Sequence, residues 1–179
     1  MFGGLADSCA QVVRPAMGAV RSYTGALFSD TVEFEDESAG LSAAAAPVKV
    51  CTAQYQKIEP WAAGEPLSRT ITLSFSLRLG DDAVAATERH FDRALDATKG
   101  SETTGLGDES FESWGAPDDT ASSAFRKSNV FVSVAVFGSN MSEGEGISGP
   151  RAGRAELEPG ARAIAEALAA DLSAALTSN

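Results

Sequence analysis

Residues 68–79 have the sequence SRTITLSFSLRL, which is the clearest structural pattern in the chain. Apolar side chains occupy every second position from Ile71 to Leu79, and polar side chains occupy the positions between them. Successive side chains of a strand point to opposite faces of a sheet, so this alternation predicts a strand with one buried and one exposed face. Half-buried strands of this kind are typical of antiparallel sheets.

A helix is expected directly after this strand. Gly80 ends the strand, and Asp81 or Asp82 can cap the first turn of a helix that extends to about Thr98. Apolar residues recur in this segment at helical spacing. The residues predicted to face inward are Val84, Phe91, Leu95 and either Thr87 or Glu88.

Residues 121–125 and 129–137 are predicted to form a hairpin around a polar turn at residues 126–129. The second of these strands is apolar on both faces, which predicts a place in the centre of the sheet. A shorter strand is predicted before the hairpin, through Phe111 and Trp114.

The stretch that follows the hairpin is rich in glycine and poor in apolar residues. It predicts a flexible loop over residues 139–159, and loops of this length inside a domain are uncommon and often functional. Pro159 is expected at the first position of a final helix, because proline is favoured there. The apolar residues at helical spacing in this segment are Ile164, Leu168, Leu172 and Leu176.

The N-terminal part predicts one irregular helix and one good strand. Asp7 and Ser8 supply capping oxygens for a helix that Pro15 kinks or restarts. The β-branched and aromatic residues of 48–58 predict a strand. Residues 26–34 alternate weakly and predict a first strand, and an acidic, then Ala- and Ser-rich mobile connection follows it up to Pro47.

Together these elements predict an α+β fold. Strands occur in clusters that single helices interrupt, and the regular alternation that would favour a parallel sheet is missing. We therefore expect an antiparallel sheet of about five to six strands with three helices packed on its faces. The length of 179 residues corresponds to a single domain spanning residues 1–179.

The charge balance and the single histidine exclude several classes of function. The chain has 14 basic and 25 acidic residues and a net charge of −11, which opposes binding to nucleic acid or to anionic lipid. The one histidine, His90, excludes sites that need two imidazoles, such as multi-histidine zinc sites. We find no catalytic constellation, and we expect no cofactor and no metal ion. The acidic run from Glu33 to Glu37 lacks EF-hand spacing and is interpreted as a solvated loop.

The two cysteines bear on the compartment of the protein. Cys9 lies beside a predicted helix start and Cys51 within a predicted strand. A disulfide between them is the leading interpretation, and it would place the domain outside the cytoplasm. The alternative is a pair of buried free thiols in a cytosolic protein.

Five polar or aromatic residues form a candidate binding surface: Asp108, Glu109, Trp114, Arg126 and Lys127. Two neighbouring carboxylates beside an aromatic ring are an arrangement that glycosidases use, and His90 could serve as a base. The simpler interpretation is that Arg126 and Lys127 are solvated turn residues and that Asp108 and Glu109 belong to an ordinary turn.

Four segments together carry a family resemblance. They are Asp7-Ser8-Cys9 with Val12-Val13 and Pro15, Val48-Lys49-Val50-Cys51, the stretch 103–111, and the stretch 124–134. With these segments the chain resembles the actinobacterial cell-envelope lipoproteins grouped as domain of unknown function 3558. The resemblance implies a secreted lipoprotein that is anchored through a separate upstream cysteine and whose two domain cysteines form a disulfide. This chain departs from the family pattern because the aromatic residue that often follows the second cysteine is displaced to Tyr55.

From residues and resemblance together we expect an extracytoplasmic, non-catalytic accessory module that binds a ligand or a protein in the cell envelope. The expected partner is an envelope protein or a small molecule, with no role for nucleic acid. Contact with the membrane is expected only through an anchor absent from this chain. The alternatives are an envelope hydrolase that uses Asp108 and Glu109, and a structural subunit of a larger envelope complex.

Overall fold

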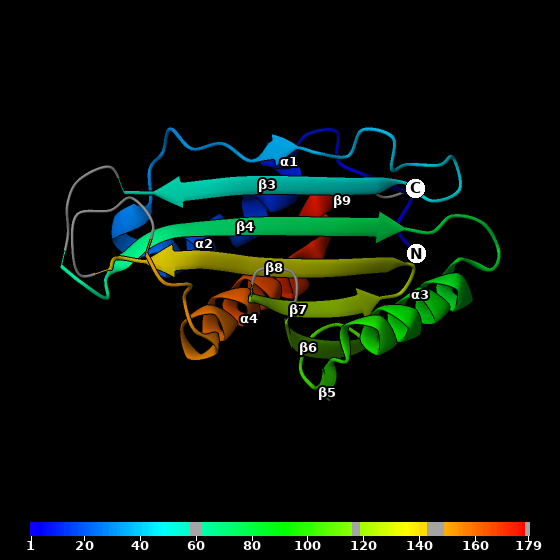
Figure 1. Ribbon diagram of the computed structural model, residues 1–179. Coiled ribbons are helices and arrows are strands. Elements are labelled where there is room, and N and C mark those ends of the chain that lie inside the picture. The colour runs from blue at the N-terminus through cyan, green and yellow to red at the C-terminus, as the bar shows by residue number, and fades with distance from the viewer. Residues whose placement is uncertain (58–61, 116–118, 143–148, 178–179) are drawn as a thin grey trace.

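A computed structural model describes residues 1–57, 62–115, 119–142 and 149–177 of the chain (Figure 1). Its centre is a seven-stranded antiparallel sheet with the strand order β2-β3-β4-β8-β7-β6-β5. A separate two-stranded antiparallel pair joins β1 near the N-terminus to β9 near the C-terminus. The strands are β1 (Gly4–Leu5), β2 (Glu35–Asp36), β3 (Val48–Gln56), β4 (Pro66–Leu77), β5 (Ser101–Thr103), β6 (Glu109–Gly115), β7 (Thr120–Lys127), β8 (Val130–Asn140) and β9 (Leu176–Thr177).

The predicted α+β class and the antiparallel sheet are confirmed, and β8 lies in the centre of the sheet as expected. The strand count was slightly low, because the edge strands β2 and β5 have only two and three residues. Such short strands pair through their main chains and carry no apolar alternation. Residues 26–34 are not a strand: they begin within a 3-10 turn at Gly25–Leu27, and pairing with β3 begins only at Glu35.

The helices are α1 (Cys9–Val13), α2 (Met17–Thr24), α3 (Ala83–Thr98) and α4 (Arg154–Ala170). A 3-10 turn that contains Pro15 separates α1 from α2, so the predicted interruption of the first helix is confirmed. Ser8 caps α1, because its side chain accepts a hydrogen bond from the backbone N–H of Gln11. The α3 helix matches its predicted range and buries Thr87 rather than Glu88.

Helix α4 begins five residues earlier than predicted, at Arg154, so Pro159 lies inside the helix instead of opening it. The carboxylate of Glu156 accepts a hydrogen bond from the backbone N–H of Gly153 and stabilises this earlier start. The predicted loop is therefore shorter, because β8 extends to Asn140 and α4 occupies 154–159. Residues 143–148 of that loop lie outside the described part of the chain.

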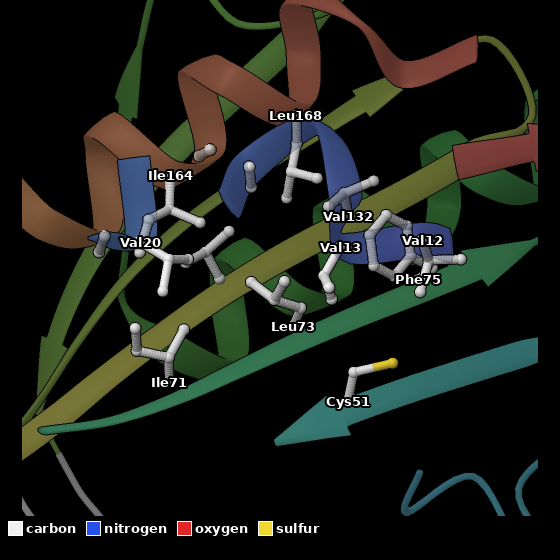
Figure 2. Close-up of a cluster of buried hydrophobic side chains, with 14 of the residues drawn as sticks. Val12, Val13, Val20, Cys51, Ile71, Leu73, Phe75, Val132, Ile164 and Leu168 are labelled. Carbon is white, nitrogen blue, oxygen red and sulfur yellow. The ribbon is translucent and has the colours of Figure 1, made fainter. Parts of the chain in front are cut away.

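The main core lies between one face of the sheet and helices α1, α2 and α4. Figure 2 shows the side chains of β4 and β8 on this face pointing toward the helices, whose apolar residues meet them. Each fully buried Leu or Val side chain stabilises the fold by about 1.5–3 kcal/mol relative to an exposed one. Leu172 and Leu176 are also buried, as their spacing predicted, but they follow the end of α4 in a 3-10 turn and in β9.

Candidate functional site

Cys9 at the start of α1 and Cys51 in β3 form a disulfide, with a Cα–Cα distance of 5.6 Å. Both residues are buried, and neither cysteine is free. The predicted pair is confirmed, and the alternative of two free thiols is wrong. The bond ties the first helix to a strand close to one edge of the sheet.

Three members of the candidate binding surface meet in an ion cluster on β6, β7 and the turn before β6. The guanidinium of Arg126 pairs with Glu109 on the neighbouring strand, with Asp108 at 3.5 Å and with Glu88 of α3 at 3.1 Å. The Arg126 side chain is only 11% exposed, so the expectation of a solvated turn residue is wrong for this position. The hairpin turn comprises only residues 128–129, because β7 includes Arg126 and Lys127.

Asp108 also holds the hairpin turn between β7 and β8. Its carboxylate accepts a hydrogen bond of 2.6 Å from the backbone N–H of Ser128, which has a positive φ of 56°. Its own backbone N–H donates to the carbonyl of Arg126 at 2.8 Å. A Cβ at Gly107 would lie 2.2 Å from that same carbonyl oxygen, so the close approach requires glycine. Asp108 and Glu109 thus bind the guanidinium and the turn.

The ring contact of His90 is with an aromatic side chain and not with these carboxylates. Its imidazole packs edge-on against Phe131, with the ring centroids 4.9 Å apart. Partial burial lowers its pKa, and repulsion from Arg78 and Arg93 adds to this shift. The neutral ring is therefore part of the packing between α3 and β8.

The other two members of the candidate surface lie apart from the ion cluster. Trp114 is five residues beyond Glu109 on β6, where it packs against the main core. It also lines a cavity of about 520 Å³ between β6, β7, β8 and the end of α3. Lys127 is exposed at the end of β7. The five residues do not form one continuous surface.

The acidic run before β3 is fastened to that strand by its own side chains. Asp36 pairs with Lys49 at 2.7 Å, and hydrogen bonds from Lys49 and Ser38 lower the pKa of Asp36 to about 2. The hydroxyl of Thr52 donates to Glu37 at 3.0 Å. These contacts hold Asp36 and Glu37 of the acidic run against β3.

A buried polar network at the start of α4 went unnoticed in the sequence. Arg69 is 4% exposed and donates to the carbonyls of Ser68 and Ser139 and to the side chain of Asn140. Asn140 in turn donates to Glu156. The backbone N–H of Gly153, then Asn140 and Arg69, lower the pKa of Glu156. The sequence did indicate the burial of Arg69, because it lies two residues before Ile71 and therefore on the same side of β4 as the alternating apolar residues.

The sheet has a second face, and within the described ranges no helix or strand covers much of it (Figure 1). Helix α3 crosses only one part of this face, where Phe91 packs on a small cluster with Phe111, Ala124 and Phe131. The uncovered remainder, called the open face below, consists of Val50, Thr52, Gln54, Ser68, Thr70, Thr72, Ser74, Ser122, Ser133, Ala135, Phe137 and Ser139.

None of these twelve residues is charged, although 22% of the chain is charged. Charged side chains lie at the edges of the face, where Glu35 of β2 pairs with Thr52 and Arg151 is bridged to Ser139. A surface of this size ordinarily carries about three or four charged residues. Its hydroxyls pair in part with one another: Thr52 with Thr72 at 3.1 Å, and Ser68 with Ser139 at 2.9 Å. Each hydroxyl can donate one bond and accept two, so paired hydroxyls keep bonding capacity.

Three cavities open onto this face. One of about 390 Å³ and one of about 300 Å³ share Gln54 and Thr70 as lining residues. The third, of about 520 Å³, includes Ser122 and Ala135. The open face is therefore hollowed at both ends, beside β3 and beneath the end of α3.

Comparison of the chain with protein-family models, with curated proteins and with solved structures finds no match. In the described ranges, no helix is long and apolar enough to cross a membrane. Nor do the described residues bring together three or more His, Cys, Asp or Glu side chains that could hold a metal ion.

Proposed function

We propose that this protein is an extracytoplasmic, non-catalytic binding module of the cell envelope and that it binds its ligand or partner on the open face. The observation that carries the proposal is the lack of charge across the hydroxyl-rich centre of a hollowed sheet face, whose charged side chains lie at its edges, in a chain of net charge −11. An ordinary solvated face of an acidic protein would carry Asp, Glu or Lys side chains. A surface that a ligand covers has reason to exclude them, because burying an unpaired charge is costly.

The disulfide supports a location outside the cytoplasm, because disulfides persist in oxidising compartments. The resemblance to actinobacterial envelope lipoproteins leads to the same location, and we propose membership of that family. The ion cluster is the weaker candidate for binding. Asp108, Glu109 and Arg126 already bind one another or the hairpin turn, and a ligand would have to break these contacts.

Co-sedimentation with cell envelope tests the proposal. The envelope is isolated from the organism that makes the chain, and the purified protein is added at increasing concentration. Ser133→Lys places a charge in the middle of the open face, and its long side chain can reach solvent without disturbing the core. Ser22→Lys places the same charge on the exposed side of α2, beyond the other face of the sheet.

We expect wild type and Ser22→Lys to sediment with envelope equally well and Ser133→Lys to lose at least tenfold in affinity. Circular dichroism and thermal unfolding establish that both variants are folded. Equal binding by the two variants, or no binding by the wild type, would overturn the proposal.

A further inference from the structure

The registers of the sheet align the open face into two rows of side chains that cross the strands. One row contains Gln54, Thr70 and Phe137. The other contains Thr52, Thr72, Ala135 and Ser122. The two rows lie next to each other because their members are two residues apart on each of β3, β4 and β8.

These rows run from the two cavities at β3 and β4 to the large cavity at the α3 end, and the strip of sheet that they form is called the trough below. The two cavities at β3 and β4 include Thr52, Gln54, Thr70 and Phe137. The large cavity at the other end begins at Ala135 and Ser122. From β3 to β7 the trough crosses three strand spacings, which is about 14 Å at roughly 4.8 Å per spacing. The far end continues beneath Thr98 and Lys99 of α3.

The floor of the trough offers hydroxyl and amide groups with a small apolar patch. The hydroxyls and the Gln54 side chain can both donate and accept hydrogen bonds. A ligand that replaces water here must therefore bring closely spaced groups that donate and accept as well. The half-buried ring of Phe137 and the methyl group of Ala135 offer an apolar contact between them. A sugar ring presents this combination, with hydroxyls around its rim and C–H groups on its faces.

Charge also restricts the ligand. The floor has no charged side chain, and the net charge of −11 repels a polyanion. Charges lie at the rims, with Glu33, Glu35 and Glu37 beside β3, Arg151 beside Ser139 and Lys99 at the α3 end. A chain that carries charge along its length would find no charged partner in the middle of the trough, around Thr72 and Ala135.

We propose that the trough binds an uncharged polysaccharide chain that lies across β3, β4, β8 and β7. This inference rests on the proposed function and names the chemical class of its ligand. Thr72 donates to or accepts from sugar hydroxyls in the middle of the trough, and Phe137 stacks against a sugar ring beside it.

Three fractions of the same envelope serve as probes: its neutral polysaccharides, its anionic polysaccharides and its proteins. Each fraction is titrated into isotope-labelled protein while backbone amide chemical shifts are recorded, and each is used to compete with envelope in the sedimentation assay. We expect only the neutral polysaccharide fraction to compete. We expect it to shift the amides of Gln54, Thr70, Thr72, Ala135 and Phe137.

Two matched variants test the contacts. Thr72→Val removes the hydroxyl at nearly constant volume and should weaken binding of the neutral fraction 3- to 10-fold, the loss of about one hydrogen bond. Thr104→Val makes the same change at an exposed position beyond β5 and should leave binding unchanged. Phe137→Ala should weaken binding at least fivefold.

The outcomes separate the two proposals. Competition by the anionic or the protein fraction alone, with the Ser133→Lys effect intact, would overturn the polysaccharide ligand and leave the binding module in place. Shifts from the neutral fraction that map away from the trough would overturn the trough as the glycan site. Loss of the Ser133→Lys effect would overturn both.

Discussion

Removing the disulfide should lower the free energy of unfolding by about 4 kcal/mol. The perturbation is the double variant Cys9→Ala with Cys51→Ala, because alanine leaves no unpaired hydroxyl in a buried position. The bond joins residues that are 42 positions apart. The chain-entropy relation for a loop of this length gives about 4 kcal/mol at 25 °C, most of it through restriction of the unfolded chain. At roughly 2–4 °C for each kcal/mol in a domain of this size, the thermal midpoint should fall by roughly 8–16 °C.

Urea unfolding followed by circular dichroism measures the change. The slope of the free energy with urea should increase in the variant, because an unfolded chain without the cross-link exposes more surface. The reduced wild-type protein is the matched control, since it keeps both sulfur atoms in the core. The difference between reduced wild type and the double variant isolates the cost of the small cavity that alanine leaves.

The first helix is held by apolar packing as well as by the disulfide, and this packing determines which result would refute the reasoning. Val12, Val13 and Val20 are fully or almost fully buried beside the sheet, so α1 and α2 also have an apolar anchor. A loss below about 1 kcal/mol in both the reduced protein and the variant would mean that this packing alone holds the helix and that the entropy argument fails. Hydrogen exchange should show earlier opening of α1 than of α4 after reduction, because only α1 is tethered by the bond.

Three further outcomes are expected. Gly107→Ala should destabilise the fold by about 2–4 kcal/mol in urea unfolding, because the new Cβ would meet the carbonyl of Arg126 at 2.2 Å; Gly105→Ala, with a positive φ but open space, should cost about 1 kcal/mol. Arg126→Met should cost about 2 kcal/mol at pH 7 in urea unfolding, since it leaves three carboxylates together without their shared cation. The lowered pKa of Glu156 stabilises the fold above the ordinary carboxyl pKa, and this contribution is lost as the pH falls through the lowered value. Glu156→Gln should therefore flatten the decline in stability between about pH 5 and pH 3.

The sequence by itself determined the strands β4 and β8 and the helix α3. In β4 and α3 the period of the apolar residues states which face is buried, and in β8 the run of apolar residues on both faces indicates a central strand. The acidic composition and the presence of two cysteines that could pair were also evident from the sequence alone. Whether the two cysteines do pair depended on the packing of the elements that carry them.

The tertiary structure alone decided how distant segments pair. The short strands β2 and β5 exist because their main chains bond to β3 and β6, and such pairing leaves no side-chain pattern in so few residues. The sequence predicts that Arg126 is a polar turn residue. In the structure, three carboxylates from β6, from the turn before it and from α3 pair with the Arg126 guanidinium. The early start of α4 depends on Glu156 and on the buried Arg69 network beside it.

The open face is also a product of the tertiary structure. Its residues come from two pairs of strands that are distant in sequence, β3 with β4 and β7 with β8, and no single strand shows the whole surface. The lack of charge emerges when the registers place these strands side by side. The helices then determine which surface stays open, because α1, α2 and α4 bury the apolar face and α3 covers only part of the other.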